Sequence, residues 1–185
     1  MGEAATVAVI GAGSVGREIA LAAALAGYRT ILEDILPSSL RKAQKAFCTN
    51  LQEAVASGDL SAERAQSARG RLEYAQSVEE AARQADLVIE AVPEELESKL
   101  EIFILLDKIC RPATILVTTS LETDVTQLAT ATYRTERCAG MRRIGDHSAG
   151  RFEVVAGQAT SEETSAVVRA LAANMSRHWS PAHLQ

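Results

Sequence analysis

The chain has 185 residues, 47% of them hydrophobic and 23% charged, which is ordinary for a globular protein of one domain. Its formal net charge is −5, and it has no cluster of lysines and arginines, so we expect no nucleic-acid partner. No segment reaches the roughly 18 apolar residues of a membrane span, and the three separated cysteines form neither a disulfide framework nor a Cys-x-x-Cys metal pair. We therefore expect a single cytoplasmic domain over 1–185, with reduced thiols, no bound metal and no membrane contact.

The first elements in the chain are a β-rich run at 6–10, an alanine-rich helix at 17–26 and a second strand at 29–32. The pattern then changes. A long helix is predicted from Pro37 to Ala56, because its apolar residues recur at helical spacing. A break at 57–59 and a second helix from Ser61 follow. Residues 37–70 are therefore expected to form a helical hairpin inserted after the second strand.

Strands and helices alternate through the rest of the chain. The expected strands are 71–75, 86–92, 114–118, 138–141 and 152–156, and the expected helices are 78–84, 95–109, 125–132 and 161–175. The apolar run within 86–92 is typical of a strand that is buried on both faces. This alternation predicts a doubly wound α/β fold, with a mainly parallel sheet between two layers of helices.

A glycine-rich turn lies between the first strand and the first helix, with the sequence Gly11-Ala12-Gly13-Ser14-Val15-Gly16. The first glycine permits a tight turn, the second leaves room for a pyrophosphate, and the third lets the helix pack closely on the strand. The helix N-terminus then offers free N–H groups to phosphates. These features predict a Rossmann-type dinucleotide site that includes all of these positions except Ala12.

Asp34 follows the second strand, where a carboxylate can accept hydrogen bonds from the hydroxyl groups of the adenosine ribose. The same carboxylate would repel the 2′-phosphate of NADP. We therefore expect NAD as the cofactor. FAD is disfavoured because the chain leaves little room for a flavin domain.

The chain resembles the NAD-binding domain of the L-3-hydroxyacyl-CoA dehydrogenases. The resemblance covers nearly the whole chain, and its distinctive parts are the helical hairpin and the run Ala85-Asp86-Leu87-Val88-Ile89-Glu90-Ala91-Val92-Pro93-Glu94. Further matches are the segments Val7–Gly16, Glu136-Arg137, Phe152–Val155 and Ala159–Thr164. The resemblance implies an oxidoreductase of fatty acid metabolism that interconverts L-3-hydroxyacyl-CoA and 3-ketoacyl-CoA with NAD.

The resemblance also implies roles for individual residues. Glu94 and Lys99 match residues that contact the nicotinamide half of the cofactor, and Ala91 is expected to lie against the cofactor at the end of its strand. Glu153 matches the acid that orients the catalytic histidine.

The active-site segments depart from the family pattern. Arg142 stands where the family has its histidine base, and an arginine stays protonated and cannot accept the hydroxyl proton. An ungapped match also puts Leu121 in place of the substrate-binding serine, although a shift of one residue would bring Ser120 there. His147 is the nearest histidine, and we consider it with Glu153 as a candidate catalytic pair.

Three interpretations follow from the sequence. The chain is an NAD-dependent dehydrogenase of acyl-CoA substrates, or a catalytically inactive NAD(H)-binding paralogue, or a dehydrogenase of a different small acid that Arg142 or Arg143 holds. The chain stops about where the family's C-terminal helical domain begins. We expect a homo-oligomer that associates through apolar surface on the hairpin or on the last helix.

Overall fold

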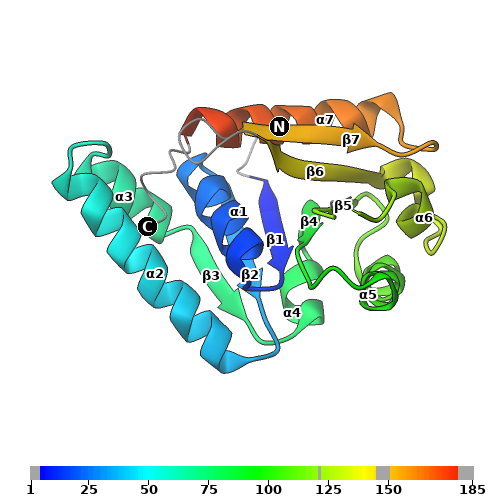
Figure 1. Ribbon diagram of the computed structural model, residues 1–185, viewed down its shortest axis with the longest axis horizontal. Helices are drawn as coiled ribbons and strands as arrows, with labels where there is room; N and C mark the ends of the chain where they lie inside the picture. The colour runs from blue at the N-terminus through cyan, green and yellow to red at the C-terminus, as the bar shows by residue number, and fades with distance from the viewer. Residues whose placement is uncertain (1–4, 121, 145–150, 179–185) are drawn as a thin grey trace.

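A seven-stranded sheet runs through the protein in the order β3-β2-β1-β4-β5-β6-β7 (Figure 1). The computed structural model describes residues 5–120, 122–144 and 151–178. All neighbouring strands pair in parallel except β7, which is antiparallel to β6. The strands are β1 (Thr6–Ile10), β2 (Arg29–Glu33), β3 (Leu72–Ala75), β4 (Leu87–Glu90), β5 (Ile115–Thr118), β6 (Cys138–Ile144) and β7 (Arg151–Ala156). The predicted Rossmann-type, mainly parallel α/β fold is confirmed.

Helices cover both faces of the sheet, and each face has its own apolar core. Helices α1, α2, α3 and α7 belong to one face, and α4, α5 and α6 cover the other. The helices are α1 (Ser14–Leu25), α2 (Pro37–Ala56), α3 (Ala62–Arg69), α4 (Val78–Ala82), α5 (Leu96–Ile109), α6 (Val125–Ala129) and α7 (Glu162–His178), with a 3₁₀ turn η1 at Thr135–Arg137. Among the described residues, none of the helices has the length and hydropathy of a membrane span.

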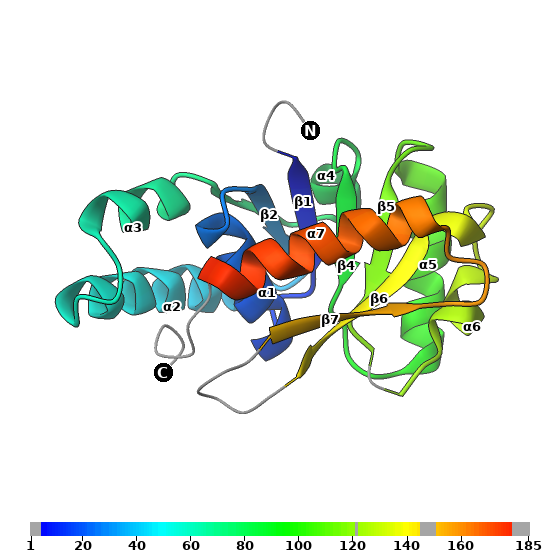
Figure 2. The ribbon, with the colours of Figure 1, turned by 90° about the horizontal axis from the view of Figure 1, so that it is seen from above.

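The inserted hairpin is formed by α2 and α3, as the sequence predicts. Helix α2 begins at Pro37, which suits a first helical position because its missing N–H needs no partner there. Ser61 caps α3 by accepting a hydrogen bond from the N–H of Arg64 at 3.3 Å. Figures 1 and 2 both show the hairpin reaching away from the sheet on the β3 side. Residues that follow β1, β4 and β5 are exposed or part-exposed, among them Ser14, Glu94 and Ser120.

Several boundaries differ from the sequence predictions, and two of them matter for the site. Helix α1 starts at Ser14, directly after the second glycine, and not at 17. Strand β6 continues to Ile144 and not only to 141, because its last residues pair with β7. That pairing joins distant parts of the chain, so the local apolar pattern gives no sign of it.

The exposed apolar residues do not lie where we expected them. Among the described residues, no large apolar side chain is exposed on α3 or α7, or within α2, because these helices turn their apolar faces into the core. The large exposed apolar residues lie near the carboxyl edge of the sheet, on α5 and before η1: Val15, Ile35, Leu36, Leu96, Ile104, Leu105 and Tyr133. The exposed apolar area thus lies beside the start of the hairpin and on α5, outside 37–70 and α7, and self-association stays a prediction.

Candidate cofactor site at the carboxyl edge of the sheet

The glycine turn has the shape that a dinucleotide cofactor requires. Gly11 has a φ of +104°, and a Cβ atom on Gly16 would lie 1.8 Å from the carbonyl oxygen of Gly11. These two glycines are needed for the turn itself. Gly13 is different, because a Cβ atom there would meet nothing within 4 Å. The space beside Gly13 opens outward, where the predicted pyrophosphate would need it.

The first turn of α1 keeps its backbone donors available. Its N-cap is Gly13, no side chain caps the helix, and no acidic residue lies in the first turn. Ser14 and Val15 are exposed there. An uncapped N-terminus of a 12-residue helix offers N–H groups and a partial positive charge to an anion. The described residues thus fit the phosphates of NAD.

Asp34 lies directly beside this turn. Its carboxylate accepts hydrogen bonds from the backbone N–H groups of Ala12 and Leu36, both at 2.9 Å. The first of these bonds joins the end of β2 to the glycine turn. Each carboxylate oxygen can accept further bonds, so Asp34 can still receive ribose hydroxyl groups. The structure therefore brings together two features that the sequence separates by more than 20 residues.

Glu33 is a second acid at this position, and the sequence analysis assigned it no role. Only 4% of the residue is exposed. It pairs in register with Ile10 and Ala75, which belong to the core under α4 and α5. Burial first, and repulsion from Asp34 second, together raise the pKa of Glu33 to about 7. A buried carboxyl group that titrates near neutrality thus lies next to Asp34.

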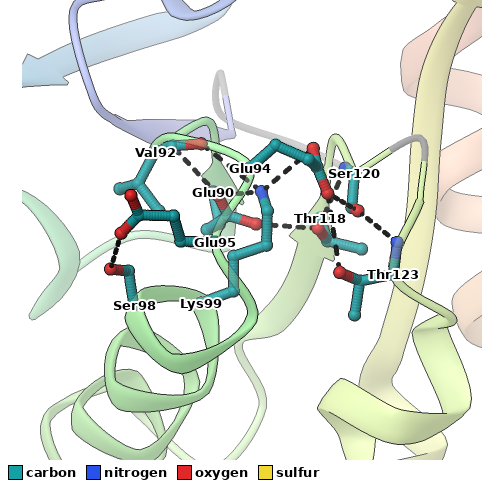
Figure 3. A network of polar contacts seen from close by, with 9 residues as sticks. All are labelled: Glu90, Val92, Glu94, Glu95, Ser98, Lys99, Thr118, Ser120 and Thr123. Atoms are coloured by element: carbon teal, nitrogen blue, oxygen red, sulfur yellow. Dashed lines mark hydrogen bonds and ion pairs between the residues drawn. The ribbon is translucent and has the colours of Figure 1, made fainter.

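A buried charge network lies at the ends of β4 and β5 (Figure 3). The Nζ of Lys99 lies 2.9 Å from Oε1 of Glu90, and the Thr118 hydroxyl donates to the other Glu90 oxygen at 2.7 Å. The Val92 N–H also donates to Glu90 at 2.8 Å. Lys99 and Glu90 are both completely buried, so this ion pair is stable only because its remaining donors and acceptors are also satisfied.

Sequence reasoning named Lys99 as a cofactor contact but missed its internal partner Glu90. The signal was present, because Glu90 is an acid inside an apolar strand and Lys99 lies on the helix that follows. The Lys99 ammonium also lies 3.4 Å from the Val92 carbonyl oxygen and 3.7 Å from a Glu94 carboxylate oxygen. Lys99 therefore holds the loop that carries Ala91 and Glu94.

Glu94 links the loop after β4 to the loop after β5. The Ser120 hydroxyl donates a hydrogen bond to Glu94, and Thr123 Oγ1 lies 3.5 Å from the same carboxylate oxygen. The Thr123 N–H donates to Ser120 Oγ at 2.8 Å. The structure thus places Ser120 in the site, while Leu121 lies outside the described residues.

Strands β6 and β7 complete this edge of the sheet. Arg142 pairs directly opposite Glu153 in the register of β6 and β7. The neighbouring Arg143 has its Nε 3.2 Å from a Glu18 carboxylate oxygen on α1. The predicted catalytic residue His147 lies outside the described residues.

Known proteins are similar to this chain in sequence. A family model described as 3-hydroxyacyl-CoA dehydrogenase, NAD binding domain, matches residues 6–180. The chain is 36% identical over 172 residues to the probable 3-hydroxybutyryl-CoA dehydrogenase of Bacillus subtilis, a match that covers 92% of this chain and 60% of that protein. It is also 36% identical to the 3-hydroxyadipyl-CoA dehydrogenase of Escherichia coli, over 85% of this chain and 33% of that protein.

Solved structures agree with these matches. The crystal structure of 3-hydroxybutyryl-CoA dehydrogenase from Escherichia coli superposes with a TM-score of 0.86 at 33% identity. The match covers 94% of this chain and 37% of that one. The (S)-3-hydroxybutyryl-CoA dehydrogenase from Ralstonia eutropha superposes with a TM-score of 0.87 at 28% identity, over 94% of this chain and 62% of that one. The chain thus spans less than two thirds of the length of each of these relatives.

Proposed function

The chain belongs to the family of NAD-binding domains of 3-hydroxyacyl-CoA dehydrogenases, with NAD as its cofactor, and we propose that it serves the oxidation of a hydroxyacyl substrate. The reaction that we propose interconverts an L-3-hydroxyacyl-CoA and the 3-ketoacyl-CoA, as the names of the relatives suggest. One observation carries the proposal: the open space at Gly13, the uncapped start of α1 and the Asp34 carboxylate adjoin one another at the glycine turn.

In this proposal the residues of the chain have distinct tasks. The first turn of α1 binds the pyrophosphate, and Asp34 receives the ribose hydroxyl groups. NAD supplies the hydride acceptor. Glu94 is held by Lys99 on one side and by Ser120 on the other, so its carboxylate is fixed where the loops after β4 and β5 meet. From that position it can orient the nicotinamide amide, which has N–H donors for a carboxylate.

A second candidate function is an NAD(H)-binding paralogue without dehydrogenase activity. It is favoured by Arg142, which we align with the histidine base of the family. A guanidinium stays protonated at any working pH and cannot accept the substrate proton. Glu153 lies opposite Arg142 and is exposed, and the remaining candidate base is His147.

Calorimetry and a turnover assay separate the two functions. We expect NAD to bind the purified chain, and Asp34→Ala to weaken binding at least tenfold, because the ribose contacts are lost. Asp59→Ala is the matched control, since Asp59 lies in the turn between α2 and α3. Loss of NADH absorbance with acetoacetyl-CoA, abolished by His147→Ala, would establish the dehydrogenase. NAD binding without turnover would establish the second function for this chain, and absence of NAD binding would overturn both.

We also propose the cellular setting. The three cysteines are all free, with Cys110 and Cys138 buried, which supports a reducing compartment such as the cytoplasm.

Self-association stays a prediction. The exposed residues Ile104 and Leu105 on α5 offer apolar area for it, and light scattering at increasing protein concentration tests it.

A further inference from the structure

Two adjacent arginines near the end of β6, Arg142 and Arg143, lie on opposite faces of the sheet. Arg143 forms an ion pair with Glu18, which lies on α1. Successive residues of a strand point to opposite faces of a sheet. Arg142 therefore points to the other face, the one covered by α5 and α6, where its register partner is Glu153 of β7. The two arginine side chains thus lie on opposite faces of the sheet.

The position of Arg142 follows from the strand register. Gly140 pairs with Thr118, and Thr118 pairs with Glu90, so these three residues form a row at the ends of their strands. Arg142 lies two residues further along β6 and on the same face as this row. Strand β5 ends at Thr118, so the chain beside Arg142 is the loop that carries Ser120. Arg142 thus lies at the same edge of the sheet as the Glu94 and Ser120 contacts.

The Arg142 side chain is part-buried, and its Nε is completely covered without a hydrogen-bond partner. No ion pair joins it to Glu153 or to any other acid among the described residues. A covered donor without an acceptor is costly, and most so when the group is charged. A ligand acceptor that displaced the atoms covering Nε would remove that cost, and the rest of the side chain is part-exposed to such a ligand.

The charges around Arg142 favour one chemical class of ligand. A guanidinium presents its donors as a planar fork that fits a carboxylate or a phosphate. Two carboxylates, Glu94 and Glu153, belong to the same edge of the sheet, and they disfavour a doubly charged phosphate more than a singly charged carboxylate. An uncharged thioester carbonyl would satisfy one donor and leave the positive charge uncompensated.

We propose that Arg142 binds the free carboxylate of the substrate, so that the chain acts on a hydroxy acid or its oxo acid. This inference rests on the NAD-dependent oxidation of a hydroxyl group proposed above, and it differs from that proposal in giving the substrate a free carboxylate in place of the CoA thioester. Oxidation of the hydroxyl group transfers a hydride to NAD and releases one proton, and the carboxylate held by Arg142 is unchanged by the reaction.

Binding of acetoacetate, measured by calorimetry with and without NADH, tests this inference. Methyl acetoacetate is the uncharged control, and we expect it to bind at least tenfold more weakly than acetoacetate. Arg142→Gln should weaken acetoacetate binding at least tenfold without changing methyl acetoacetate or NAD binding. Arg142→Lys keeps the charge but loses the fork, so it should give an intermediate affinity. Arg143→Gln is the matched neighbour and should leave acetoacetate binding unchanged.

The outcomes distinguish this inference from the proposed function. Equal binding of acetoacetate and its methyl ester to the unaltered chain would overturn the inference, and this comparison needs no variant to fold. Inorganic phosphate that binds more tightly than acetoacetate would overturn the carboxylate class. NAD binding without acetoacetate binding would overturn the inference and leave the proposed cofactor site unaffected. Acetoacetate binding that depends on Arg142, in a chain that binds no NAD, would support the anion site and overturn the proposed function.

Discussion

Glu33 shows how a single residue makes stability depend on pH. Its pKa is raised from an ordinary value of 4.5 to about 7, chiefly by burial. The folded protein therefore holds a proton on Glu33 that the unfolded chain releases. Its contribution to stability is complete below about pH 4.5 and is lost as the pH rises through about 7. The shift corresponds to about 3 kcal/mol.

We predict that Glu33→Gln removes this loss, because glutamine has no charge to bury. The difference in unfolding free energy between variant and wild type should move in favour of the variant between pH 5 and pH 8, by on the order of 2–3 kcal/mol. Urea unfolding at both pH values measures it. Glu73 is the control, because its hydrogen bond to Arg29 lowers its pKa from 4.5. Glu73 is therefore ionised in both the folded and the unfolded chain from pH 5 to pH 8, so the Glu73→Gln difference should be flat over this range. A Glu33→Gln difference that is flat with pH would contradict the assignment.

At the scale of elements, the turn between β1 and α1 contains one glycine that stability requires and another that cofactor binding requires. We predict that Gly16→Ala destabilises the protein by on the order of 3 kcal/mol or more, because the new Cβ meets backbone that cannot move aside. Gly13→Ala should cost about 1 kcal/mol or less, since only the helix cap changes, but should weaken NAD binding at least tenfold.

Urea unfolding and calorimetry check both variants of the turn. Gly70→Ala is the matched control, because a Cβ there makes only ordinary contacts at 3.6 Å. Equal loss of stability in Gly13→Ala and Gly16→Ala would show that both glycines have the same structural role, which would contradict their different surroundings in this structure.

The same elements show what sequence can and cannot predict. The bounds of α2 follow from Pro37 and from the break after Ala56, both of which are local signals. The Asp34 site follows from a spacing that the fold requires. The extension of β6 to Ile144 depends on pairing with β7, and the covered Nε of Arg142 lacks a partner because no neighbouring element among the described residues supplies an acceptor. Such features arise from the three-dimensional arrangement, so no local pattern records them.

For the whole molecule, cofactor binding and global stability are linked. The cofactor residues come from the turn before α1, the end of β2 and the loop after β4, and these segments are far apart in the unfolded chain. NAD should therefore bind only the folded protein. NAD at one hundred times its dissociation constant should stabilise the fold by about 2.7 kcal/mol, because a ligand specific to the folded state shifts the unfolding equilibrium by mass action. For a domain of this size the melting temperature should rise by about 5–10 °C.

NADP is the discriminating ligand in a thermal unfolding experiment. At the same concentration it should raise the melting temperature by much less than NAD, because the Asp34 carboxylate repels its 2′-phosphate. Asp34→Ser removes that repulsion and should narrow the difference between the two cofactors. It should leave the unliganded protein less stable as well, since the hydrogen bonds from Ala12 and Leu36 lose their charged acceptor. Equal stabilisation of the unaltered chain by NAD and NADP would show that Asp34 does not face the adenosine ribose.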